Sequence, residues 1–149
     1  MNASETVDSL LEMWFIDSKI DETEPSKELS KISILHSKYL EIMSHHNLIV
    51  KKIQFEYNTQ KKFKTDYLTG ELNNPEDLAK HNLEPVRRKI MRQDIQMHLD
   101  ADEQLIQILI KKIVNQEMVD ICESIIKEIH NRAFVLGNIV KWEMYTGGR

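Results

Sequence analysis

The sequence is poor in the residues that make turns and crosslinks. It has four glycines, three prolines and one cysteine among 149 residues. So few turn-forming residues argue against a β-sandwich or a β-barrel. The single cysteine, Cys122, excludes an internal disulfide. Its apolar helical surroundings favour a buried thiol in a reducing compartment.

The sequence also lacks the patterns of membrane insertion and of catalysis. It has no apolar run of about 18 residues, and its acidic start lacks a secretory pattern, so we expect neither a transmembrane helix nor export. It has no glycine-rich phosphate loop, and its six histidines show no ligand spacing such as HExxH. Asp100, Asp102 and Glu103 lie at a helix start, where acids are ordinary. We therefore expect no catalytic residue, metal site or cofactor.

What the sequence does have is length without interruption. The 44 residues 26–69, between Pro25 and Gly70, contain no proline and no glycine, so we predict one long helix over residues 25–70. Its apolar residues recur every three or four positions, a spacing that favours packing against another long helix. This apolar stripe consists of Ile32, Leu35, Tyr39, Ile42, Ile49, Ile53, Phe63 and Tyr67, with polar steps at His46, Glu56 and Gln60.

A second long helix is predicted within residues 100–149, over about 101–145. It is apolar on nearly every side in its first half, which one intramolecular partner cannot cover. We therefore expect a homo-oligomer, most simply a closed symmetric one. The predicted interface residues are Leu105, Ile106, Leu109, Ile110, Ile113, Ile125, Ile129 and Leu136.

The remaining segments are shorter. Residues 1–24 form an acidic arm with a helix over residues 4–13, for which Ser4 is the expected N-cap. The apolar cluster at residues 14–16 must pack on the chain's own long helix or on a neighbouring subunit. The acidic residues after it either screen the basic arm or form a solvated linker. In the connector, residues 71–99, Asn74 and Pro75 begin a short helix, and residues 93–99 form a helix or a short extended piece.

These elements predict an all-α fold in one domain. Two long helices form an antiparallel hairpin, a short helix precedes them, and copies assemble into a homo-oligomeric ring.

Charge is strongly segregated along the chain. The formal net charge is −4, but residues 1–30 carry −6 and residues 31–64 carry +5. Residues 85–92 carry +4 with no acid, whereas residues 65–84 and 93–149 are acidic. Local basic blocks attract polyanions regardless of the average, so binding to nucleic acid is compatible with the acidic total.

Aromatic residues accompany the lysines at the end of the first long helix. Cations that follow phosphates, together with rings that stack on unpaired bases, are the means by which proteins bind single strands. The competing interpretation is that the lysines form a solvated face, the rings belong to the core, and the protein is a non-enzymatic scaffold. The predicted nucleic-acid-binding residues are Lys51, Lys52, Tyr57, Lys61, Lys62, Phe63, Lys64 and Tyr67, with a second block of Arg87, Arg88, Lys89 and Arg92.

Several short motifs, taken in their order and spacing, resemble the UvsY family, the recombination mediators of T-even-like bacteriophages. Within that family the basic stretch Lys-Ala-Arg-Leu is implicated in binding single-stranded DNA. Residues 62–65 of this chain, Lys-Phe-Lys-Thr, occupy that place and keep both positive charges. The motifs are Phe15-Ile16-Asp17-Ser18, Leu35, Ser37, Lys38 and Leu40, Gln60-Lys61-Lys62, Asp66-Tyr67-x-Thr69-Gly70, Cys122, Arg132-Ala133-Phe134 and the terminal glycines.

The resemblance implies a non-enzymatic protein of DNA recombination, repair and replication. It implies a hexameric or heptameric ring that binds single-stranded DNA in the cytoplasm of the infected bacterial host. The implied partners are a RecA-like recombinase and the single-stranded-DNA-binding protein, since a mediator helps the recombinase load onto coated strands. No membrane partner is implied.

Overall fold

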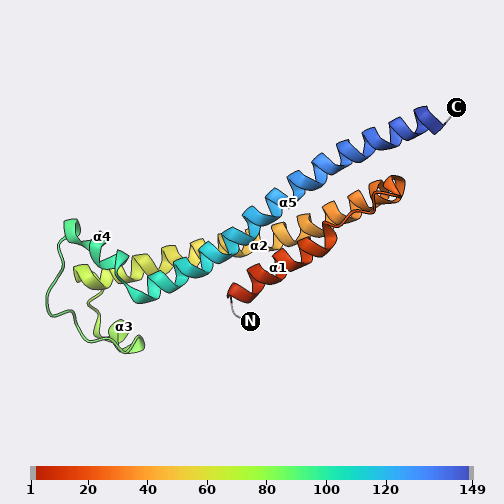
Figure 1. Ribbon diagram of the computed structural model, residues 1–149. Helices are drawn as coiled ribbons and strands as arrows, with labels where there is room; N and C mark the ends of the chain where they lie inside the picture. The colour runs from red at the N-terminus through yellow and green to blue at the C-terminus, as the bar shows by residue number, and fades with distance from the viewer. Residues whose placement is uncertain (1–2, 148–149) are drawn as a thin grey trace. The chain divides into compact units, whose positions relative to one another are not determined.

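The computed structural model describes residues 3–147, with side chains from residue 7 onwards, and contains no strand in that range. The all-α fold class is therefore confirmed (Figure 1). None of its helices is long and apolar enough to span a membrane within this range. The helices are α1 (Ala3–Asp17), α2 (Pro25–Thr69), α3 (Pro75–Lys80), α4 (Arg92–Asp100) and α5 (Glu103–Gly147).

The two long helices lie where the sequence predicts them. Each has 45 residues. Pro25 opens α2, and Gly70 follows its last residue with a φ of +79°, a left-handed conformation that glycine adopts at little cost. The predicted start of the last helix needs a correction, because Asp100 ends α4 and α5 begins only at Glu103.

The shorter helices confirm one prediction and extend two others. Asn74 caps α3, accepting a hydrogen bond from the Glu76 backbone N–H at 3.0 Å. Residues 93–99, left open between helix and extended chain, belong to α4. Helix α1 runs four residues further than predicted, to Asp17, and so includes the apolar cluster at 14–16. The predicted cap by the Ser4 side chain lies outside the described residues.

Contacts divide the chain into two compact units, to which both α2 and α5 contribute. Unit 1 holds residues up to 49 and from 114 onwards, and unit 2 holds residues 50–113. In unit 1, α1 packs on the first part of α2 and the later part of α5. The core of this unit consists of Leu10, Tyr39, Met118, Cys122, Ile125 and Ile129.

Side chains of unit 1 make specific contacts at the places where its helices pack, one between two rings and one between two polar groups. The Trp14 and Tyr39 rings pack edge to face with centroids 5.5 Å apart. His46, the polar step in the apolar stripe of α2, places Nδ1 2.8 Å from Asn115 Oδ1 on α5. His46 is therefore a hydrogen-bonded packing residue, as its place in the stripe suggests.

Asp17 joins α1 to α2 within this unit. Its Oδ2 accepts hydrogen bonds from Lys38 Nζ at 2.6 Å and from the Tyr39 hydroxyl at 2.8 Å. Burial alone raises the pKa of Asp17, but these two hydrogen bonds and the Lys38 charge outweigh it, so the pKa lies below its ordinary value.

Unit 2 has a separate core, to which every helix segment in it contributes. Its buried apolar side chains are Ile53, Leu78, Ile95, Leu99, Leu105 and Ile108. Here too α2 and α5 run antiparallel. Lys112 Nζ donates to Gln54 Oε1 at 2.6 Å, and nearer the connector Lys64 pairs with Asp102 at 2.9 Å.

The Asp17 network makes stability depend on pH. We predict that Asp17→Asn lowers the free energy of unfolding by about 1–3 kcal/mol near neutral pH, since it weakens two charge-assisted hydrogen bonds. A lowered folded-state pKa stabilises the fold above the unfolded-state pKa, and this stabilisation is lost as pH falls through the folded-state pKa. Urea unfolding of both proteins, at one protein concentration across acid pH, should show the difference shrinking. A difference that does not change with pH contradicts the role given to this carboxylate.

Candidate nucleic-acid interface

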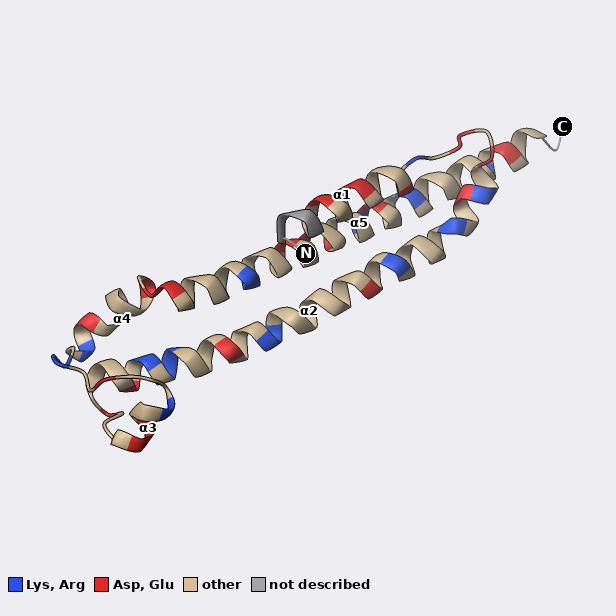
Figure 2. Ribbon diagram, turned by 90° about the horizontal axis from the view of Figure 1, so that it is seen from below, with Lys and Arg blue, Asp and Glu red and all other residues tan. Residues whose placement is uncertain are grey.

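The lysines of α2 in unit 2 are not equivalent. Lys51, Lys52 and Lys62 are exposed, and Figure 2 shows the basic residues recurring along this helix. Lys62 Nζ lies 2.9 Å from Asp66 Oδ2, one turn further along, and this carboxylate raises the pKa of Lys62. Lys61 is half-buried, and its Nζ lies 6.0 Å from the centroid of the Tyr57 ring. All four ammonium groups remain close to solvent.

Lys64 has a different role. Its side chain is only 17% exposed, and Nζ pairs with Asp102 Oδ2 at 2.9 Å. Asp102 also caps α5 by accepting the Leu105 N–H at 2.9 Å. Burial raises the pKa of Asp102, but the backbone hydrogen bond and Lys64 together bring it below its ordinary value. Lys64 thus holds α2 against the start of α5, and its charge is already neutralised by a neighbour.

Two of the predicted stacking rings are also occupied. The Phe63 ring lies 4.5 Å from the His81 imidazole, measured between centroids. The Tyr67 hydroxyl donates to the Glu84 carbonyl at 2.8 Å. Both rings hold the connector against α2 and are half-buried, which agrees with the interpretation that they belong to the packed structure. Phe63 and Tyr67 both belong to the apolar stripe of α2, and this position in the sequence already indicated that the two rings are packed.

The connector folds back onto the end of α2. The Ile90 N–H donates to the Leu68 carbonyl at 3.0 Å. The Lys89 side chain lies over Gly70, where a Cβ would come within 2.6 Å of Lys89 Cε. A side chain at position 70 would therefore displace Lys89, in addition to the strain of a positive φ.

This folding brings the second basic block, residues 87–92, back to the C-terminal end of α2. Leu68 is six residues, or about 9 Å of helix, beyond Lys62. Cations near the C-terminal end of a helix are also favoured by its dipole. Arg87, Arg88 and Arg92 are exposed there, and Arg92 lies 3.5 Å from Glu71 across a solvent-exposed pair. We call this set the basic end surface: Lys61, Lys62, Arg87, Arg88, Lys89 and Arg92.

A hollow of about 480 Å³ opens in the second block. Arg88, Lys89 and His98 contribute its polar lining, with Asp94 as its one acid, and Met91 and Met97 contribute flexible apolar side chains. It contains no Phe, Tyr or Trp ring, and the His98 imidazole is the one flat ring in its lining. The hollow therefore offers mainly charge to a strand.

The predicted set omitted one aromatic residue. Phe55 is 70% exposed, and Lys51 and Lys52 precede it by four and three residues, so all three share one face of α2. Its position off the apolar stripe was the available signal, because a large ring off the buried stripe points to solvent.

The predicted oligomer interface divides into two groups. Leu105, Ile125, Ile129 and Leu136 are buried among the chain's own helices, so they are not available to a neighbour in this conformation. Ile125 and Ile129 belong to the core that α1 completes, which the apolar pattern of the last helix alone does not reveal. Ile106, Ile110 and Ile113 are 38%, 45% and 65% exposed, and Leu109 is half-buried.

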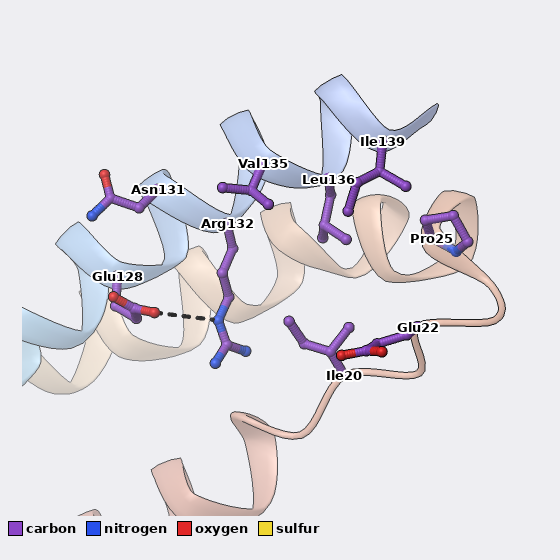
Figure 3. Close-up of a pocket in the computed structure, with 9 residues that line it drawn as sticks. All are labelled: Ile20, Glu22, Pro25, Glu128, Asn131, Arg132, Val135, Leu136 and Ile139. Atoms are coloured by element: carbon purple, nitrogen blue, oxygen red, sulfur yellow. Dashed lines mark ion pairs between the residues drawn. The ribbon is translucent and has the colours of Figure 1, made fainter. Parts of the chain in front are cut away.

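Unit 1 also presents an apolar hollow, of about 630 Å³ (Figure 3). Ile20, Pro25, Leu136 and Ile139 give it an apolar lining, and Glu128 and Arg132 form an ion pair at its edge with 3.7 Å between Oε1 and Nε. In Figure 3 the Arg132 side chain extends from α5 toward Ile20, and the Glu22 carboxylate lies beside Ile20.

Neither metal binding nor thiol chemistry has support in the described residues. Among residues 3–147 no group of three or more His, Cys, Asp or Glu side chains is placed to hold a metal ion. Cys122 is buried, and burial raises its pKa to about 11, which disfavours the reactive thiolate.

Comparison with known proteins points to one family. The family model described as "Recombination, repair and ssDNA binding protein UvsY" matches residues 13–149. No curated protein matches the chain.

Solved structures agree on the fold. A crystal structure of the bacteriophage T4 recombination mediator protein UvsY, lattice type II, is 20% identical, with a TM-score of 0.79 over 94% of this chain and 96% of that one. Lattice type IV is 19% identical, with a TM-score of 0.79 over 93% and 98% of the two chains. Lattice type I is 20% identical, with a TM-score of 0.78 over the same shares. At these identities the likeness concerns the fold.

Replacing Lys64 tests whether this lysine has a structural role that the exposed lysines of α2 lack. We predict that Lys64→Ala lowers the free energy of unfolding by about 1–3 kcal/mol, because it leaves Asp102 partly buried without its cation. Lys62→Ala, which removes an equal charge from an exposed site, should change it by less than about 0.5 kcal/mol. Chemical denaturation measures both. Equal effects would mean that Lys64 has no special structural role.

Proposed function

The chain belongs to the UvsY family of recombination, repair and single-stranded-DNA-binding proteins, and we propose that it is a recombination mediator acting through the basic end surface. The mediator role is the role named for the T4 protein of the same fold. The single observation that supports this site is that the connector returns to the C-terminal end of α2, where Ile90 bonds to Leu68 and the Lys89 side chain lies over Gly70.

The chemistry of this surface suits binding that does not depend on sequence. Ammonium and guanidinium groups contact phosphates of any strand, and most of these cations are exposed. Tyr57 lies under Lys61 and adds one ring to the same part of the helix. Such a surface has no fixed set of donors and acceptors for particular bases, so affinity comes from charge and is sensitive to salt.

We propose that several copies act together as a ring of six or seven. The exposed apolar face at Ile106, Ile110 and Ile113 supports assembly, since residues four and three apart on a helix form a continuous patch that a partner can cover. Linking several weak surfaces raises the effective concentration for each further contact with the same strand. A ring therefore binds a long strand far more tightly than one copy does.

In this proposal the ring acts on strands already coated by a single-stranded-DNA-binding protein, in the cytoplasm of the infected bacterial host. Contacts with several copies bend the strand and weaken the hold of the coating protein. A RecA-like recombinase then forms its filament on the exposed strand. No bond is made or broken in these steps, so the protein needs no catalytic residue or cofactor.

Salt dependence tests the DNA site. We predict that the triple variant Lys62→Ala, Arg87→Ala, Arg88→Ala binds a labelled oligo(dT) more weakly and with a flatter salt slope, by about 0.7 log unit for each phosphate that is no longer neutralised. Fluorescence anisotropy across a range of salt concentrations measures both quantities. The matched control, Lys27→Ala, Lys127→Ala, Lys141→Ala, removes the same charge from exposed sites in unit 1 and should keep the wild-type slope.

Equal slopes in the two triple variants would contradict the site. Absence of wild-type binding in dilute buffer would favour the scaffold interpretation over the mediator.

Assembly is tested through the isoleucine face. We predict that Ile110→Asp lowers the mass found by sedimentation at micromolar concentration, because it places a carboxylate in an apolar contact. Gln107→Asp introduces the same carboxylate at an exposed position of α5 and should leave the mass unchanged. Equal masses for wild type and Ile110→Asp would exclude this face as an interface.

A further inference from the structure

The outward face of α1 has no cover in its own unit. Helix α1 packs inward through Val7, Leu10 and Trp14. On the opposite side Leu11, Phe15 and Ile16 are 47%, 67% and 65% exposed. Three large exposed apolar side chains on one short helix make a patch that a soluble chain normally covers.

This patch is acidic as well as apolar. Asp8 and Glu12 are exposed and precede Phe15 by seven and three residues, so they share its face of the helix. Lys19 Nζ lies 5.1 Å from the centroid of the Phe15 ring, which shows that the face of this ring already attracts an ammonium group. The patch is therefore suited to a surface that combines lysines with apolar groups.

The same chain carries such a surface on α2. Phe55 is 70% exposed, with Lys51 and Lys52 exposed four and three residues before it. Leu11 and Glu12 stand in the same relation to Phe15. Each surface thus has a central phenylalanine with neighbours at the same spacing. Asp8 and Glu12 on α1 are opposite in sign to Lys51 and Lys52 on α2, while Lys19 beside Phe15 and Glu56 beside Phe55 each reduce the contrast by one charge.

From this match we infer that the outward face of α1 of one copy docks on the Lys51–Lys52–Phe55 face of α2 of the next copy. A contact between two different surfaces of one chain is head-to-tail, and repeated copies close into a ring when the rotation fits. The inference rests on the proposed assembly and names a further pair of surfaces, besides the isoleucine face of α5, that join its copies. The acids add orientation and selectivity, and the two phenylalanines add buried apolar area.

The inferred contact leaves the DNA site open. The basic end surface begins at Lys61, more than two helical turns beyond Lys52. Docking therefore covers Lys51 and Lys52, two of the predicted DNA-binding lysines, while Lys62, Arg87 and Arg88 stay accessible to a strand.

Charge reversal on each surface, and on both together, tests the contact. One variant carries Asp8→Lys with Glu12→Lys, another carries Lys51→Glu with Lys52→Glu, and a third combines all four changes. We expect each reversed pair to raise the protein concentration needed for half-assembly by at least about tenfold, since like charges facing each other are costly. The combined variant should assemble within about threefold of wild type. Sedimentation measures the mass, and circular dichroism checks that the helices are kept.

A matched control separates the contact from net charge. Glu76→Lys with Glu143→Lys makes the same change in charge as the reversed pair on α1, at exposed sites outside both faces, and should assemble as wild type does. The inference is overturned if either reversed pair assembles at the wild-type concentration, or if the combined variant assembles no better than the single pairs. A wild-type protein that sediments as one copy would instead overturn the proposed assembly itself.

Discussion

The fold depends on covering the apolar stripe of α2, because a helix in a protein owes most of its stability to the packing of its apolar face. Helix α5 covers this stripe in both units, through the core around Tyr39 in unit 1 and through the Lys112–Gln54 and Lys64–Asp102 contacts in unit 2. In unit 1 Tyr39 is completely buried in this packing, and in unit 2 Ile53 has the same role. At one polar step of the stripe, His46, the Asn115 side chain on α5 provides a hydrogen-bonding partner. The stripe therefore fixes which face of α2 remains for binding.

The covered face divides the basic residues into two classes. Lys64 lies at the edge of the packed face, and its ion pair with Asp102 ties the cap of α5 to α2. Lys62, two residues earlier, faces solvent. In the stretch that resembles the family's DNA-binding motif, one cation thus maintains the structure, and the other lies in an exposed pair with Asp66. The proposed binding site therefore draws on the cations of the connector as well.

The connector is held by side chains whose residue types suggest a role in binding DNA. Tyr67 and Phe63 bind Glu84 and His81 instead of bases, and Gly70 leaves room for Lys89. These contacts bring the second basic block to the C-terminal end of α2, the arrangement on which the proposed DNA site depends. They also explain how an acidic protein can attract a polyanion, since the potential at this surface depends on nearby charges more than on the total.

The sequence by itself determined the helices. Pro25, Gly70 and Asn74 mark helix ends because their effect on the backbone is local, and the apolar spacing identified the buried side of α2 for the same reason. It also pointed to the family. Only the tertiary structure decided which cations and rings are free. Lys64 meets Asp102 and Leu68 meets Ile90 across long stretches of chain, and α1 covers isoleucines of α5 that the apolar pattern assigned to a neighbour. Such pairings depend on how the helices pack against one another, so they cannot be predicted from local propensity.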